Sequence, residues 1–155
     1  MNTGAAAVMH RRTTPLLLVA AVFVAAGGFV HLRDWLEIYR SVPSSVAGAA
    51  VVRVGFPVNV GVSVVLAVAL VITVFRWRRF IPVVVGATLV FQAASLAALI
   101  VSRTGSLAGW MEPVWTVGAN QSRAVEIGAM AALTAVVAIV ALQHRVSTSP
   151  VPVRS

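Results

Sequence analysis

The chain has 155 residues, of which 59% are hydrophobic and only 10% are charged. A soluble domain is usually about half apolar and about a quarter charged, so this composition excludes an ordinary soluble domain. The net charge of +8 is carried by arginine alone. These arginines are scattered between apolar segments rather than clustered on one polar face, which argues against a nucleic-acid partner. Without cysteine, the chain cannot form disulfides or ligate an iron–sulfur cluster through thiolates.

Four windows with little or no charge lie between arginines, at approximately residues 13–32, 54–75, 80–102 and 122–143. About 20 helical residues, at 1.5 Å each, cross a hydrocarbon core of ~30 Å. Helix is the expected form, because four segments cannot close a β-barrel. We therefore predict an all-α fold, a four-transmembrane-helix bundle in a single membrane domain over residues 1–146. A polar, proline-containing tail at 147–155 is expected to be disordered and cytoplasmic.

The first window has a second interpretation, because Arg11 and Arg12 followed by an apolar run and small residues are also typical of a signal peptide. Three further spans follow, however, and the sequence continues beyond Gly28 without a clean cleavage site. The first window is therefore interpreted as a membrane span.

Arginine also predicts the orientation, because cytoplasmic loops collect positive charge. With the N-terminus inside, seven arginines are cytoplasmic and five are outside, and the short basic turn at 76–79 is a strong inner anchor. All four acids then lie outside or in the outer half: Asp34, Glu37, Glu112 and Glu126. We predict a multi-pass membrane protein with both termini cytoplasmic.

The outer connections carry amphipathic and aromatic features. Residues 32–40 place apolar and charged side chains on opposite helical faces. This pattern predicts a short interfacial amphipathic helix after helix 1, or a continuation of that helix. The small, apolar residues 42–52 form either a loop packed on the bundle or an extension of helix 2, with Pro57 as a kink. Trp110 and Trp115 suit the headgroup level as anchors.

Small and polar residues predict how the helices pack, because helices in lipid associate through close contacts and a few hydrogen bonds. The fourth helix carries a seam of small residues, and the first offers three more on one face. The third and second helices carry polar stripes that should face the bundle interior. The seam of the fourth helix is Ala124, Gly128, Ala131, Ala135 and Ala138, and the small residues of the first are Ala21, Ala25 and Gly28. The polar stripe of the third helix is Thr88, Gln92, Ser95 and Ser102, and that of the second is Asn59 with Ser63.

Two ionisable residues near the outer boundary are the main functional candidates. His31 ends the first span and Glu126 lies near the start of the fourth, and an acid at that depth is a functional-site hypothesis. A histidine–carboxylate pair could move a proton or hold the head of a small ligand. We predict ligand- or proton-binding roles for His31, Asn59, Gln92, Arg123 and Glu126. The competing interpretation is structural, with Glu126 paired to Arg123 or Arg53 and the other polar groups joining helices.

Other chemistry is poorly supported. His10 and His144 belong to the opposite side from His31, so no two histidines can share a site, and we expect neither a metal nor a cofactor. No catalytic residues are predicted, and whether the chain is an enzyme stays open. The basic turn at 76–79 could bind an anionic lipid head or a partner's acidic patch, or it could act only as a topology determinant.

The run Gly28-Phe29-Val30-His31-Leu32, followed by Trp35, Tyr39 and Pro43, resembles the end of the first helix in small four-helix membrane proteins of the DoxX-like kind. The layout, with a short inner turn, long outer loops and an acid early in the fourth helix, is similar to that of uncharacterised actinobacterial members. DoxX itself is associated with thiosulfate–quinone redox chemistry and with membrane complexes handling oxidative stress. The resemblance implies a role for His31 and Glu126.

The leading hypothesis is therefore a small DoxX-like protein of the bacterial cytoplasmic (inner) membrane, acting as an accessory or ligand-binding subunit with an outward-facing polar site. A small multidrug-type transporter, working as an oligomer around a membrane acid, is the first alternative, and a quinone- or lipid-linked membrane enzyme is the second. Expected partners are membrane lipids and either a membrane-protein complex or a second copy of the chain.

Overall fold

The structure is a computed structural model that describes residues 3–148 of the chain. Four long helices are joined by two short 3₁₀ turns and irregular connections, and no strand occurs within these residues. The elements are α1 (Thr3–Glu37), η1 (Tyr39–Ser41), α2 (Ala49–Phe75), η2 (Arg78–Phe80), α3 (Ile81–Thr104) and α4 (Val117–Thr148). The prediction of an all-α fold is confirmed. From residue 149 onward, the predicted tail lies outside the described part.

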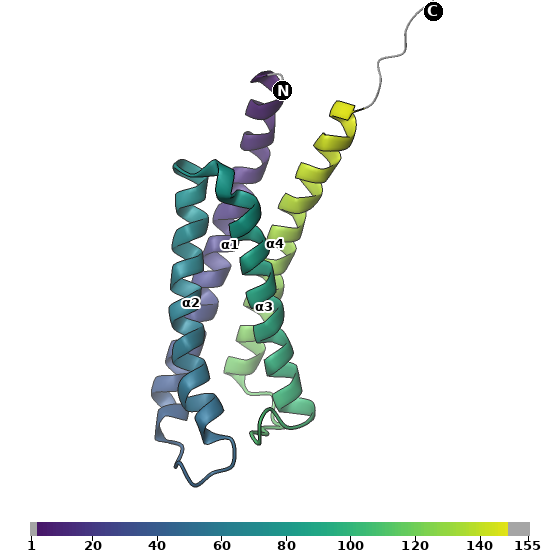
Figure 1. The fold of residues 1–155 in the computed structure, drawn as a ribbon. Coiled ribbons are helices and arrows are strands. Elements are labelled where there is room, and N and C mark those ends of the chain that lie inside the picture. Colours follow the sequence, from purple (N-terminus) through teal and green to yellow (C-terminus); the bar gives the residue numbers. More distant parts are fainter. Residues whose placement is uncertain (1–2, 149–155) are drawn as a thin grey trace, which may run out of the picture.

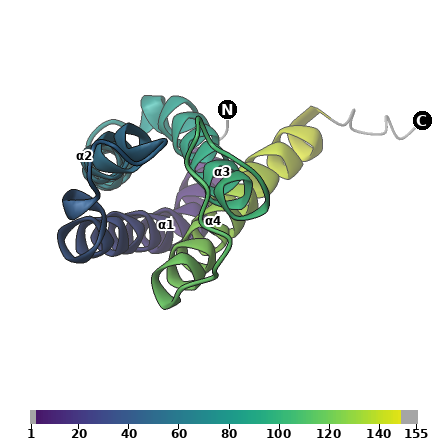
Figure 2. The ribbon, with the colours of Figure 1, turned by 90° about the horizontal axis from the view of Figure 1, so that it is seen from below.

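The helices form a ring in which each packs on two neighbours, in the order α1, α2, α3, α4 and back to α1. Helix α1 contacts α2 and α4 extensively, whereas α3 is held more loosely by α2 and α4. Figure 1 shows the beginning of α1, the end of α4 and the α2–α3 turn at one end of the bundle. The connections 38–48 and 105–116 lie together at the opposite end, which Figure 2 views from below. We call these the turn end and the loop end.

All four long helices are long and apolar enough to cross a membrane. Less than two fifths of the most apolar window of each is buried inside the bundle, and large apolar side chains such as Val22, Phe29, Val65 and Val90 stand on the outer surface. Such a surface requires an apolar solvent, because soluble proteins rarely expose apolar patches of this extent. These features indicate a multi-pass membrane protein.

The helices extend beyond the predicted spans at several ends. Helix α1 runs without a break to Glu37, α2 begins at Ala49 and runs through Pro57, and α4 begins at Val117. An apolar window marks the thickness of the hydrocarbon core, whereas backbone hydrogen bonding continues into the interface, so the helices are longer than the windows. After α1, Tyr39–Ser41 form only one 3₁₀ turn, and the interfacial amphipathic helix stays a prediction.

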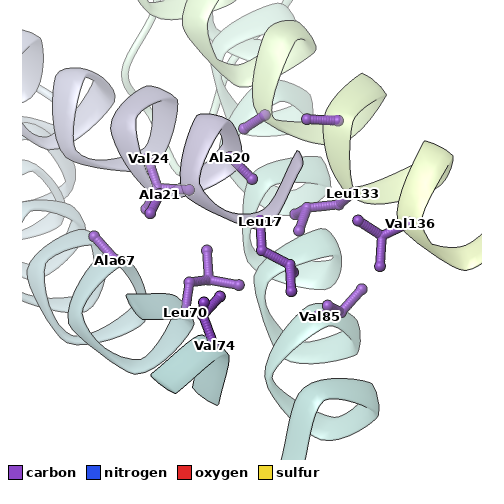
Figure 3. Close-up of a cluster of buried hydrophobic side chains, with 12 residues drawn as sticks. Leu17, Ala20, Ala21, Val24, Ala67, Leu70, Val74, Val85, Leu133 and Val136 are labelled. Carbon is purple, nitrogen blue, oxygen red and sulfur yellow. The ribbon is translucent and has the colours of Figure 1, made fainter. Parts of the chain in front are cut away.

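The interior of the bundle is divided along its length. Toward the turn end, small and branched apolar side chains of all four helices form a continuous core, shown in Figure 3. Among them Leu17, Leu70, Val85 and Leu133 contribute one side chain from each helix. Toward the loop end, buried polar side chains replace this core. The predicted polar stripe of α3 does face inward, since Thr88, Gln92 and Ser102 are buried and Ser95 is partly buried.

The predicted small-residue seam of α4 is largely wrong as a packing surface. Ala124, Ala131 and Ala138 are exposed, whereas the buried face of α4 lies one stripe away. That buried face consists of Ala119, Ser122, Glu126, Ala129, Leu133 and Val136. Small residues alone do not determine how α4 is rotated about its axis. Removing the Glu126 carboxylate from lipid and packing Leu133 in the core stabilise the observed rotation more than close backbone contact along the small-residue seam would. Gly128 is an exception, since its Cα faces the ring of Phe23 on α1. On α1, Ala21 and Gly28 are buried but Ala25 is exposed.

Candidate functional site

Polar side chains from all four helices form one hydrogen-bonded chain in the half of the bundle nearer the loop end. On α2, Ser63 Oγ donates to Asn59 Oδ1 at 3.2 Å, and Asn59 Nδ2 donates to Ser95 Oγ of α3 at 2.9 Å. Ser95 then donates its hydroxyl to Glu126 Oε1 of α4 at 2.6 Å. His31 of α1 completes the network, with Nε2 at 3.3 Å from the same carboxylate oxygen. We call these five residues the polar chain.

Glu126 is the most deeply buried member of the polar chain, with 1% of its surface exposed. A carboxylate in such a place requires a cation, donors or a proton, because an isolated buried charge is very costly. Ser95 supplies a donor, and His31 can supply either a neutral N–H or a full positive charge, depending on its protonation. The pair can therefore hold one exchangeable proton.

A second polar cluster lies closer to the loop end. The Arg103 guanidinium, at the end of α3, lies 2.7 Å from Glu112 Oε2, and its NH1 also donates to the Glu112 backbone carbonyl at 2.6 Å. The Tyr39 hydroxyl donates to Glu112 Oε2 at 2.6 Å. Burial raises the pKa of the Tyr39 phenol, and the neighbouring Glu112 carboxylate raises it further. This cluster ties the 105–116 connection to η1 and α3, and we call it the loop clasp.

A pocket of about 160 Å³ lies between the polar chain and the loop clasp. His31, Asn59 and Ser95 contribute polar atoms at one side, and Tyr39, Arg103 and Glu112 do so at the other. Apolar and aromatic side chains make up the remaining wall, including Val52, Phe56, Leu99, Leu107 and Trp110. The pocket is thus an apolar cleft with a few convergent polar groups, the usual composition of a small-molecule site.

Aromatic rings hold the polar groups of this pocket in place. The Phe56 ring packs edge-on against His31, with ring centroids 5.2 Å apart, and lies 4.4 Å from the Tyr39 ring. Trp110 meets Tyr39 edge-on at 5.9 Å. Because the Phe56 ring contacts both His31 and Tyr39, it joins the polar chain to the loop clasp.

Four buried polar atoms lack a hydrogen-bond partner within the described residues: His31 Nδ1, Gln92 Nε2, Arg103 Nε and Glu126 Oε2. Leaving such an atom unsatisfied costs about 1–3 kcal/mol, so each favours binding of another group. His31 and Arg103 both line the pocket. A bound molecule with hydrogen-bonding atoms on a compact head could therefore satisfy groups that the protein leaves open.

The structure brings together some of the predicted site residues and separates others. His31, Asn59 and Glu126 belong to the polar chain. Gln92 is buried on α3, one turn from Ser95 toward the apolar core, and does not line the pocket. Arg123 is exposed, where it donates to Asn120 Oδ1 at 3.1 Å and stacks over Trp115.

The structural alternative with an arginine partner for Glu126 is not the arrangement seen. Arg53 is exposed on α2, and its backbone carbonyl accepts a hydrogen bond from Trp35. Within the described part of the chain, the basic side chain within ion-pair distance of Glu126 is His31. Helix α4 is rotated so that Glu126 faces inward while Arg123 extends toward Trp115 at the surface.

Sequence reasoning missed the loop clasp and the role of Ser95 as the direct donor to Glu126. The signal for the clasp was weak, since Tyr39, Arg103 and Glu112 lie in three separate segments. One indication was available, because Glu112 is the lone acid of the 105–116 connection and Arg103 precedes it. Within the described residues, no group of three or more histidine or acidic side chains could hold a metal ion.

Comparison of the chain with protein-family models, with curated proteins and with solved structures gave no match.

Proposed function

We propose that this chain is a small ligand-binding protein or subunit of the bacterial inner membrane, with both termini cytoplasmic and the pocket near the outer surface. The DoxX-like resemblance and the arginine distribution support this location. The bound molecule is proposed to be amphipathic, with a compact hydrogen-bonding head in the pocket and an apolar remainder among the helices or lipid.

The convergence of the polar chain on one small pocket carries this proposal. Side chains of α1, α2 and α3 reach the pocket, and Glu126 of α4 stands directly behind two of them. A dry cavity of about 150 Å³ can hold one benzene ring, so a pocket of about 160 Å³ suits a single-ring head. The apolar wall favours the ring, whereas His31 and Arg103 offer hydrogen bonds to its substituents.

The His31–Glu126 pair suits a head group that either accepts or donates a hydrogen bond. An imidazole nitrogen that carries hydrogen donates to the head, and one that carries none accepts from it. The pair can therefore contact either kind of head.

A proton-coupled transporter is the second candidate, favoured by the burial of Glu126 inside a span that holds no other acid. In that case substrate and proton would compete for the carboxylate, as required for exchange across a membrane. Oligomeric assembly and transport by reconstituted protein, both abolished by Glu126→Gln, would favour this candidate over a binding subunit.

The binding proposal is tested with two compounds of equal apolar length, para-hexylphenol and hexylbenzene. Thermal unfolding of the purified protein in mild detergent measures binding, because a ligand of the folded state raises Tm. We expect para-hexylphenol to raise Tm more than hexylbenzene does, and expect Glu126→Gln and His31→Ala to remove the difference. Glu37→Gln, at an exposed position outside the pocket, is the control. Equal shifts for both compounds would show that the polar chain only joins helices.

A further inference from the structure

A second, apolar hollow lies at the opposite end of the bundle, between α2 and α3. Its volume is about 510 Å³, and its wall is formed by valine, alanine and isoleucine side chains with Trp77 and Phe80 at one end. The full lining is Val64, Val65, Val68, Ala69, Ile72, Thr73, Trp77, Phe80, Val83 and Val84. We call it the α2–α3 groove. The sparse contact between α2 and α3 leaves it open to the surroundings of the bundle.

The wall that α2 contributes to the groove is about as long as one membrane leaflet is thick. Val64 lies eleven residues before the end of α2 at Phe75, which corresponds to about 16 Å of helix at 1.5 Å per residue. Half of a hydrocarbon core of ~30 Å is about 15 Å. An acyl chain entering beside the α2–α3 turn would therefore remain in the groove over the depth of one leaflet.

Arginine side chains stand where the groove reaches the turn end. Arg76 and Arg79 are exposed on the α2–α3 turn, and the Arg79 guanidinium lies 4.8 Å from the centroid of the Phe80 ring. Phe80 itself contacts Trp77 edge-on, with ring centroids 6.2 Å apart. Both aromatic residues line the groove. The Arg79 guanidinium thus lies over one of the aromatic rings that line the groove, and Arg76 lies beside it in the same turn.

No acidic side chain of the chain is available to neutralise these arginines. The four acids are Asp34, Glu37, Glu112 and Glu126, and all belong to segments of the half nearer the loop end. Within residues 3–148, no acidic side chain therefore lies at the turn end beside these arginines, which favours an anion from outside the bundle. Basic pockets beside membrane helices bind the head groups of anionic lipids.

We propose that the α2–α3 groove and the turn above it form a binding site for an anionic phospholipid. One acyl chain lies along Val68 and Ile72, and the phosphate contacts Arg76 and Arg79. Trp77 and Phe80 lie at the level of the lipid glycerol, between the apolar groove and the charged head group. The site is distinct from the pocket at the loop end and does not depend on what that pocket binds.

The test uses the full-length protein and native mass spectrometry in mild detergent, with phosphatidylglycerol and phosphatidylcholine of identical acyl chains as probes. We expect phosphatidylglycerol to be retained preferentially, and expect removal of each arginine to weaken retention by about fivefold. The variant is Arg76→Gln with Arg79→Gln. Its matched control is Arg40→Gln with Arg53→Gln, two exposed arginines of the loop-end half.

A further variant separates a defined groove from diffuse attraction to positive charge. Ala69→Phe fills the groove without changing any charge and should reduce phosphatidylglycerol retention severalfold, whereas Val58→Phe, at an exposed position outside the groove, should not. Circular dichroism verifies that each variant stays helical. Equal retention of both lipids, an equal loss in the Arg40/Arg53 control, or unchanged retention in Ala69→Phe would each overturn the proposal.

Discussion

The Ser95 hydroxyl of α3 and the Glu126 carboxylate of α4 are joined by a hydrogen bond of 2.6 Å. This short contact attaches α3, the least tightly packed helix, to α4. It also fixes which carboxylate oxygen faces His31, because Oε1 accepts from Ser95 and lies 3.3 Å from the imidazole. The site and the helix packing are therefore connected through one oxygen atom.

Replacement of Glu126 distinguishes a functional carboxylate from a structural one. Glu126→Gln keeps the shape and an oxygen acceptor for Ser95, so we expect the free energy of unfolding to change by no more than about 1 kcal/mol. Glu126→Ala removes the acceptor of the Ser95 hydroxyl and the carboxylate beside His31 Nε2, and it should cost about 2–4 kcal/mol. Unfolding of both variants in detergent, together with the binding measurement above, provides the comparison.

A double-mutant cycle then tests whether His31 and Glu126 act together. Residues in one hydrogen-bond network show coupling energies of about 0.5–3 kcal/mol. We expect His31→Ala and Glu126→Gln to be non-additive in stability or in ligand binding. Strict additivity would mean that the 3.3 Å approach carries no energy and that His31 has another role.

The single tyrosine of the chain makes the loop clasp directly observable. Tyr39 is 3% exposed, and burial together with its bond to Glu112 raises its pKa. The unfolded chain releases this proton from about pH 10, whereas the folded protein retains it, so stability should fall as pH rises above about 10. Tyrosinate absorbance should therefore appear at higher pH in folded protein than in unfolded protein.

Tyr39→Phe is the matching substitution. Below pH 10 it should cost about 1.5–3 kcal/mol, because a hydrogen bond to a charged acceptor is lost. Above pH 10 this cost should shrink as the tyrosine contribution to the pH dependence disappears. A titration of folded Tyr39 at its ordinary pKa would mean that the loop clasp is open in solution.

Gly128 and Ala131 test the corrected packing of α4. A Cβ at Gly128 would lie 2.9 Å from the Phe23 ring, so Gly128→Leu should destabilise the bundle by about 1–3 kcal/mol. Ala131 belongs to the same small-residue seam but is exposed, so Ala131→Leu should change stability by less than about 0.5 kcal/mol. Comparable losses in detergent unfolding would restore the seam as a packing surface.

The proposed topology is tested by reporter fusions. We expect a reporter that is active only in the cytoplasm to be active when fused at Ser155, and one that is active only in the periplasm to be active at Ala108. The reason is that the basic turn at 76–79 favours the cytoplasm. A reporter inserted at the turn itself should report the cytoplasmic side. A periplasmic C-terminus would reverse the orientation and place the pocket at the inner surface.

Hydrophobicity and charge in the sequence determined the number, type and approximate position of the helices. Each charged side chain has its own cost of burial in lipid, whatever its neighbours are. The apolar windows between arginines therefore predict the membrane spans without knowledge of tertiary contacts. The inward orientation of the α3 stripe and of Asn59 with Ser63 was predictable for the same reason, because lipid offers polar side chains no partner.

Only the tertiary structure decided which polar groups meet. Arg123 lies three residues from Glu126 in sequence, yet His31, ninety-five residues away, is the nearer partner. The rotation of α4 that buries Glu126 and Leu133 also turns Ala124 and Ala131 outward. The rotation of α4 and the closure of the loop clasp each depend on the simultaneous packing of three or four segments. Because this packing is cooperative, no local sequence pattern predicts it.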